Sequence, residues 1–182
     1  YIDKGLKDYR VFLNYGAILQ GLGELNDAEI YTRKAIELKP DFADAYLNLG
    51  NILMDLGKLR EAEKSTRKAI ELKPDFANAH NNLGNILKNL GKLEDAELSY
   101  CKAIELKPDL TKTYFSLSTL KYSKKNKKWR NQLFADNILN NKSKKDQIDI
   151  YFARANVLHN EKNYIKSAKN LKLANDLKLG IS

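Results

Sequence analysis

The seven-residue string Ala-Ile-Glu-Leu-Lys-Pro-Asp occurs three times in this 182-residue chain, and successive copies begin 34 residues apart. The copies span Ala35–Asp41, Ala69–Asp75 and Ala103–Asp109, and they contain all three prolines of the sequence. A fixed period of about 20–50 residues is typical of stacked repeat proteins, in which each repeat packs only on its neighbours. We therefore expect an array of repeats, a kind of fold that usually serves binding.

Each repeat has the pattern of a helix pair. Aligned on the prolines, the units are 9–42, 43–76 and 77–110, and the second and third share 23 of 34 residues. In the middle unit, apolar residues recur at helical spacing on both sides of Gly57. A glycine ends a helix readily in the left-handed conformation, and the later proline cannot continue a helix. The aspartate after each proline is a candidate N-cap for the next helix.

A glycine also recurs inside the first predicted helix of each unit. Gly50 is an example, and equivalent glycines lie 34 residues before and after it. A glycine inside a helix costs about 1 kcal/mol relative to alanine, so a steric reason is expected. Gly50 is predicted to face Ala62 on the second helix, where small residues on both sides let the backbones approach closely.

The signature positions of the first helix are filled by Tyr46, Leu49, Gly50 and Leu53, and those of the second by Ala96, Tyr100, Ala103 and Pro108. This pattern resembles the tetratricopeptide repeat family, with its 34-residue helix–turn–helix unit. The resemblance implies an all-α, right-handed superhelical solenoid of antiparallel helix pairs. Such an array would bind other proteins, as a scaffold without catalytic activity.

The pattern is weaker outside residues 9–110. Residues 1–8 resemble the tail of a preceding repeat helix, and both chain ends read as cuts within a longer protein. Residues 111–147 are predicted to form a diverged unit with a basic loop and a helix around Trp129–Asn141. Residues 148–181 are predicted to form a terminal helix pair, about 148–160 and 164–178.

Positive charge is concentrated in the diverged part. Residues 1–110 contain 16 Lys and Arg against 18 Asp and Glu, whereas residues 111–182 contain 16 against 5. The segment Lys121–Arg130, with its interleaved aromatic residues, has features of a nucleic-acid contact. A solvated loop explains it as well, because lysines greatly outnumber arginines in this chain. We favour the loop and expect no nucleic-acid partner.

The sequence offers no site for chemistry. His80 and His159 lie far apart, and neither belongs to a group of His, Cys and carboxylate residues at metal-ligand spacing. His80 replaces an aromatic residue of the repeat, so a structural role is expected. No apolar stretch approaches the roughly 18 residues that cross a membrane. The single cysteine, Cys101, fits a reducing compartment. We expect a cytoplasmic protein without cofactor, metal or catalytic residues.

The resemblance also implies a binding groove, because the first helices of such arrays line a concave surface that holds extended peptides. Asparagine recurs at the sixth and ninth positions of the units. An amide both donates and accepts hydrogen bonds, which suits binding of a peptide backbone. The column resembles the asparagine ladder of the O-GlcNAc transferase family, although such asparagines also bond to neighbouring helices. The expected groove residues, with three apolar neighbours, are Asn14, Asn48, Asn51, Asn82, Asn85, Leu47, Met54 and Phe115.

The sequence also bears on three other roles. Family members that clamp the carboxylate tail of chaperones need basic residues where this chain has Leu47 and Ser116. We therefore do not expect this role. The chain could instead be the substrate-recognition or self-association region of a larger enzyme of sulfotransferase or glycosyltransferase type. In that case the catalytic domain lies outside this sequence. The end units could also assemble head to tail.

Overall fold

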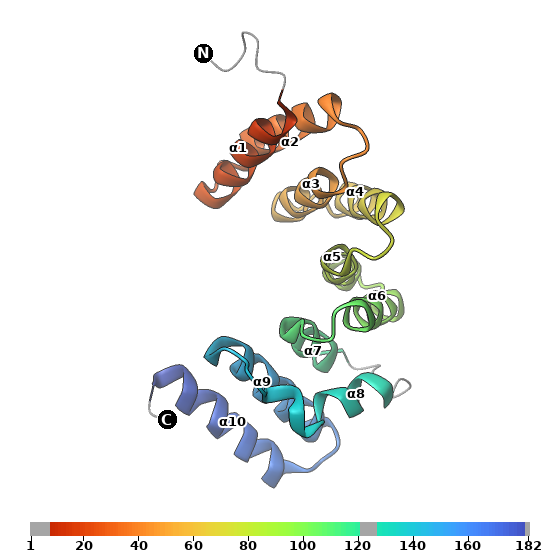
Figure 1. The fold of residues 1–182 in the computed structure, drawn as a ribbon. Coiled ribbons are helices and arrows are strands. Elements are labelled where there is room, and N and C mark those ends of the chain that lie inside the picture. The colour runs from red at the N-terminus through yellow and green to blue at the C-terminus, as the bar shows by residue number, and fades with distance from the viewer. Residues whose placement is uncertain (1–7, 121–126, 181–182) are drawn as a thin grey trace. The chain divides into compact units, whose positions relative to one another are not determined.

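The structure is a computed structural model that describes residues 8–120 and 127–180 (Figure 1). The chain divides into two compact units, residues 1–91 and residues 92–182. Helices account for all the regular structure in the described residues, which confirms the expected all-α class. Residues 1–7, most of the expected N-terminal tail, lie outside the described residues, and so do residues 121–126 of the basic loop.

The first unit stacks its helices in the order of the sequence. Each first helix packs on its own second helix, α1 on α2 and α3 on α4. Each second helix also packs on the first helix of the next repeat, α2 on α3 and α4 on α5. This alternation confirms the repeat packing expected for this part of the chain. The helices are α1 (Tyr9–Leu22), α2 (Leu25–Leu38), α3 (Ala43–Asp55), α4 (Leu59–Leu72) and α5 (Ala77–Asn89).

The turns of the first unit follow the glycine pattern, but not the predicted caps. Gly57 has a φ of 74° after the end of α3, in the left-handed region that favours glycine. The prediction that Asp41 caps α3 was wrong, because the N-cap residue is Phe42, which makes no side-chain cap bond. By contrast, the carboxylate of Asp8 accepts a hydrogen bond from the Arg10 backbone N–H at 2.9 Å at the start of α1.

The mid-helix glycines allow close packing, and threonine is their nearest neighbour. A Cβ atom placed on Gly50 would lie 2.3 Å from Thr66 Oγ1 and 3.5 Å from the Ala62 carbonyl oxygen. Both Thr66 and Ala62 are completely buried. The same arrangement recurs in the first repeat, where the Cβ would lie 2.5 Å from Thr32 Oγ1. The steric role of these glycines is confirmed, with the threonine as the tighter contact.

The second unit begins with a regular helix and continues with the diverged segment. In it α6 packs on α7, α7 packs directly on α9, and α9 packs along α10. Two helices thus occupy the range expected for the final pair, and the first of them begins four residues earlier than expected. The elements are α6 (Leu93–Leu106), α7 (Thr111–Ser118), α8 (Lys127–Leu133), the 3₁₀ helix η1 (Asp136–Leu139), α9 (Lys144–Asn160) and α10 (Tyr164–Leu179).

The single helix predicted around Trp129–Asn141 was wrong. The structure contains the short helix α8 and then η1, with Ala135 in extended conformation between them. Arg154 of α9 explains the break, because its Nε donates to the Leu133 carbonyl at 2.9 Å and its Nη2 to the Ala135 carbonyl at 3.2 Å. These bonds satisfy carbonyl groups that a longer helix would have used itself. Trp129, which is 2% exposed, anchors α8 in the core.

Candidate functional site

Asparagine side chains recur at one register position on the first helices of the first unit. Asn14, Asn48 and Asn82 belong to α1, α3 and α5, and successive residues of this set are 34 positions apart. Asn14 is exposed, whereas Asn48 and Asn82 are half-buried. Because α3 contacts both α1 and α5, equivalent positions on the three helices share one side of the unit. We call it the amide side.

Hydrogen bonds connect the first helices across the amide side. Asn82 Nδ2 donates to Asn51 Oδ1 at 2.5 Å, which joins α5 to α3. Asn81 Nδ2 donates to Asn82 Oδ1 at 3.3 Å. On the α1 side, Gln20 Nε2 donates to Asp55 Oδ2 at 2.7 Å. The alternative role expected for these asparagines, bonding between neighbouring helices, is thus present for Asn51 and Asn82.

The amide side still has unused hydrogen-bonding groups. A side-chain amide carries two N–H donors and an oxygen that can accept twice. Asn51 uses only its oxygen in the bond to Asn82, so its amino group stays available. Neither Asn14 nor Asn48 makes a side-chain hydrogen bond to another residue of the described ranges 8–120 and 127–180. These two amides are free to bind a ligand. Asn85, also on α5, is half-buried.

Two of the predicted apolar groove residues belong to the core or its edge. Leu47 is only 7% exposed and packs with Ala69 and Ala79 of α4 and α5. Its side chain fills the space between repeats and leaves little surface for a partner, in contrast to the exposed groove position expected for it. Met54 is half-buried and packs against the core cluster that contains Leu53. It can offer only part of its side chain to a partner.

Phe115 lies on α7 and so belongs to the second unit. It is 39% exposed and packs edge to face on Phe152 of α9, with ring centroids 6.4 Å apart. The asparagines all belong to the first unit, so Phe115 is not part of the same group. The residues that the structure groups on the amide side are Asn14, Asn48, Asn51, Asn82 and Asn85, with Met54 at its edge.

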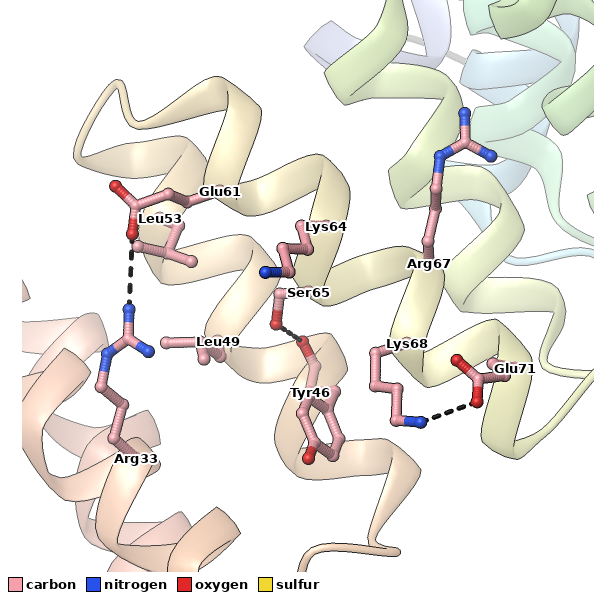
Figure 2. A pocket seen from close by; sticks show the side chains of 10 residues that line it. All are labelled: Arg33, Tyr46, Leu49, Leu53, Glu61, Lys64, Ser65, Arg67, Lys68 and Glu71. Carbon is pink, nitrogen blue, oxygen red and sulfur yellow. Dashed lines mark hydrogen bonds and ion pairs between the residues drawn. The ribbon is translucent and has the colours of Figure 1, made fainter.

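A pocket of about 550 Å³ lies on another side of α3, between α2 and α4 (Figure 2). Leu49 and Leu53 of α3 form its floor and are 4% and 1% exposed. At about 100° per residue along a helix, these leucines project on the opposite side of α3 from Asn48 and Asn51. The lining residues are Arg33, Tyr46, Leu49, Leu53, Glu61, Lys64, Ser65, Arg67, Lys68 and Glu71.

Charged side chains join the repeats beside this pocket. Arg33 donates to Glu29 Oε1 through Nε at 2.9 Å and Nη2 at 2.7 Å, and Lys58 Nζ donates to Glu29 Oε2 at 2.8 Å. Burial raises the pKa of Glu29, but the hydrogen bonds from Lys58 and Arg33 outweigh it and leave the pKa below its usual value. Arg33 also lies 3.5 Å from the Glu61 carboxylate.

The described residues show no arrangement for metal binding. No group of three or more His, Cys, Asp or Glu side chains among them is placed to hold an ion. His80 Nε2 lies 2.9 Å from the Pro74 carbonyl oxygen, a contact that supports the structural role expected for it. None of the helices in the described ranges combines the length and the apolar character needed to span a bilayer.

Sequence comparison decides the family. Models described as tetratricopeptide repeat match residues 9–42 and 77–110, and a model described as TPR repeat matches residues 33–57 and 50–91. Together these matches cover residues 9–110, more than half of the chain. The chain belongs to the tetratricopeptide repeat family. No curated protein matches it significantly.

Solved structures share the fold of this tetratricopeptide repeat (TPR) chain at low identity. MamA is 20% identical with a TM-score of 0.60, over 98% of this chain and 83% of MamA. The Arabidopsis OM64 TPR domain is 20% identical with a TM-score of 0.61, over 62% and 93%. The first TPR of Spaghetti (RPAP3), bound to the HSP90 peptide SRMEEVD, is 23% identical with a TM-score of 0.55, over 59% and 86%. These identities show a common fold and no more.

Some features of the TPR surface were missed at the sequence level, although their spacing indicates them. Gln20 and Asp55 are 35 residues apart, one more than the repeat period, so they occupy adjoining positions on neighbouring first helices. Asn51 and Asn82 are 31 apart, three fewer than the period, and lie within one helical turn of register. No residue spacing in the sequence indicates the pocket, because its lining residues come from three helices that belong to two repeats.

Proposed function

We propose that this TPR chain is a non-catalytic interaction module that binds an extended peptide along the amide side of its first unit. The observation that carries the proposal is the pair of unbonded amides, Asn14 and Asn48, in the same register on adjacent first helices. Asn51 and Asn82 support the site, because their mutual hydrogen bond holds both amides in place. The amides would bond to peptide groups of the bound chain, while Met54 contacts its side chains.

The chemistry of the amide side favours a particular kind of peptide. Amides are neutral and bond to backbone groups that every peptide has, so binding should tolerate many sequences. Neutral contacts should also make the affinity only weakly dependent on salt, unlike charge-based recognition. The HSP90 peptide in the Spaghetti structure is acidic, but the carboxylate-clamp pattern needs a basic residue where this chain has the buried Leu47. An acidic chaperone tail is therefore not the ligand we propose.

The test starts with peptides selected from a random displayed library on the immobilised chain. Fluorescence polarisation then measures their affinity for the wild type and for the double variant Asn14→Ala, Asn48→Ala. We expect the double variant to bind about 5- to 150-fold more weakly, since each of the two lost hydrogen bonds contributes about 0.5–1.5 kcal/mol. Asn26→Ala, an exposed asparagine on the second helix α2, is the matched control and should leave the affinity unchanged.

Two results would argue against this site. Equal affinity of the wild type and the double variant would remove the amide side from consideration. A loss of binding that matches a loss of helicity, measured by circular dichroism, would show that the substitutions act through folding. Both asparagines lack side-chain partners in the described residues, so we expect the helicity to stay unchanged.

A further inference from the structure

The pocket between α2 and α4 combines an apolar floor with a charged rim. Leu49 and Leu53 form the floor, and Tyr46 forms a wall beside them. Its volume of about 550 Å³ is within the usual range of about 300–1,000 Å³ for ligand pockets. The pocket can therefore accept a bulky apolar side chain together with part of the chain that carries it.

The rim carries an excess of positive charge. Four cationic residues line the pocket, Arg33, Lys64, Arg67 and Lys68, against the two carboxylates of Glu61 and Glu71. Arg67 bonds to Glu63 at 2.9 Å, and in Figure 2 it extends away from the other labelled side chains. The positive charge of Arg67 is therefore paired with a carboxylate that does not line the pocket.

Lys64 is the rim residue that is best placed to attract a ligand. It lies between two ion pairs, Arg33 with Glu61 at 3.5 Å and Lys68 with Glu71 at 2.7 Å (Figure 2). Within the described parts of the chain, no carboxylate is within ion-pair distance of Lys64. A carboxylate held above the leucine floor would supply that missing partner.

We propose that this pocket is a second binding site, which takes a short acidic peptide segment with one bulky apolar side chain. The apolar side chain packs on the half-buried ring of Tyr46, above the buried Leu49 and Leu53, and an adjacent carboxylate pairs with the exposed Lys64. Because the floor lies on the opposite side of α3 from Asn48, the site is distinct from the amide side. One repeat pair would then bind two partners of different chemistry at the same time.

The probe is the peptide acetyl-Glu-Asp-Phe-Asp-Glu-amide, titrated into the isotope-labelled chain and followed by NMR. Two control peptides replace the phenylalanine with alanine or the four acidic residues with lysine. Lys64→Glu tests the proposed contact. Lys172→Glu is the matched control, because it changes the net charge equally at an exposed lysine of the second unit. The double variant Asn14→Ala, Asn48→Ala separates this site from the amide side.

We expect saturable shifts at Leu49, Leu53 and Lys64, and an affinity that falls at least about fivefold in Lys64→Glu. Lys172→Glu and the double asparagine variant should bind within about twofold of wild type, and both control peptides should bind more weakly. The proposal is overturned by an absence of saturable shifts at millimolar peptide. It is equally overturned by equal losses in the two lysine variants, or by shifts confined to the amide side. Failure here leaves the proposed function intact, since that rests on a different surface.

Discussion

The contact between Gly50 and Thr66 gives a quantitative test of how the repeats pack. Gly50→Ala would place a Cβ atom 2.3 Å from Thr66 Oγ1, where ordinary contacts begin near 3.4 Å. Thr66 is completely buried, so its side chain cannot move away freely. Overpacking of this kind costs about 1–3 kcal/mol, whereas the better helix propensity of alanine returns about 1 kcal/mol. We expect a net loss of up to about 2 kcal/mol in the free energy of unfolding.

The effect of Gly50→Ala on the free energy of unfolding should change sign once Thr66 is shortened. Thr66→Ala removes Oγ1, and the next atom outside that side chain, the Ala62 carbonyl oxygen, lies at an ordinary 3.5 Å. No hydrogen bond is lost, because Thr66 Oγ1 has no partner in the described residues. In this background Gly50→Ala should stabilise the chain by up to about 1 kcal/mol. The coupling free energy of the pair then equals the overpacking cost, about 1–3 kcal/mol.

Denaturant unfolding followed by circular dichroism measures all four chains of this double-mutant cycle. Gly21→Ala is the matched control, because it is a helical glycine with no atom within 4 Å of the added Cβ. It should be neutral or slightly stabilising. If Gly50→Ala destabilises the chain equally with Thr66 and with Ala at position 66, the steric explanation is refuted.

Two further predictions concern ionisable groups. The pKa of Glu29 in the folded chain lies below its ordinary value of 4.5. The interactions of Glu29 with Arg33 and Lys58 therefore stabilise the fold fully above about pH 4.5, and this stabilisation is lost as the pH falls through the pKa of the folded chain. Glu29→Gln should cost about 0.5–1 kcal/mol at neutral pH and nothing in strong acid, as measured by unfolding at both pH values; a constant difference would contradict this. Burial raises the pKa of Tyr100 and Tyr114 to about 12, so stability should decline as pH rises from about 10 to 12. In an absorbance titration these two tyrosines should ionise last, and ionisation of all tyrosines near pH 10 would refute the prediction.

Residues 9–110 were predictable because each local signal agrees with the repeat. Gly57 is needed for its left-handed φ, and Gly50 for its contact with the second helix. The break after α8 was not predictable in this way. It depends on hydrogen bonds from Arg154, which lies 21 residues from Leu133 in the sequence. A tertiary contact of this kind leaves no periodic pattern in the sequence.

The shared register of the asparagines in the candidate site was predictable from the sequence, but their contacts were not. The repeat register placed Asn14, Asn48 and Asn82 on one side, because equivalent residues of stacked helices align. The register alone could not show that Asn82 bonds to Asn51. The register also could not show that the side chain of Leu47, the residue before Asn48, packs between repeats on Ala69 and Ala79. Whether a side chain is buried between two helices depends on the geometry of both helices, which the repeat register does not give.

The central claim is that the amide side of the first unit binds the partner peptide. Its most direct test is an NMR titration of the labelled chain with a selected peptide, observed at the side-chain amide groups. We predict that the amide resonances of Asn14 and Asn48 shift most, with a smaller shift at Asn51, while the exposed Asn26 of α2 does not shift. Saturable binding that leaves Asn14 and Asn48 unperturbed would contradict the claim.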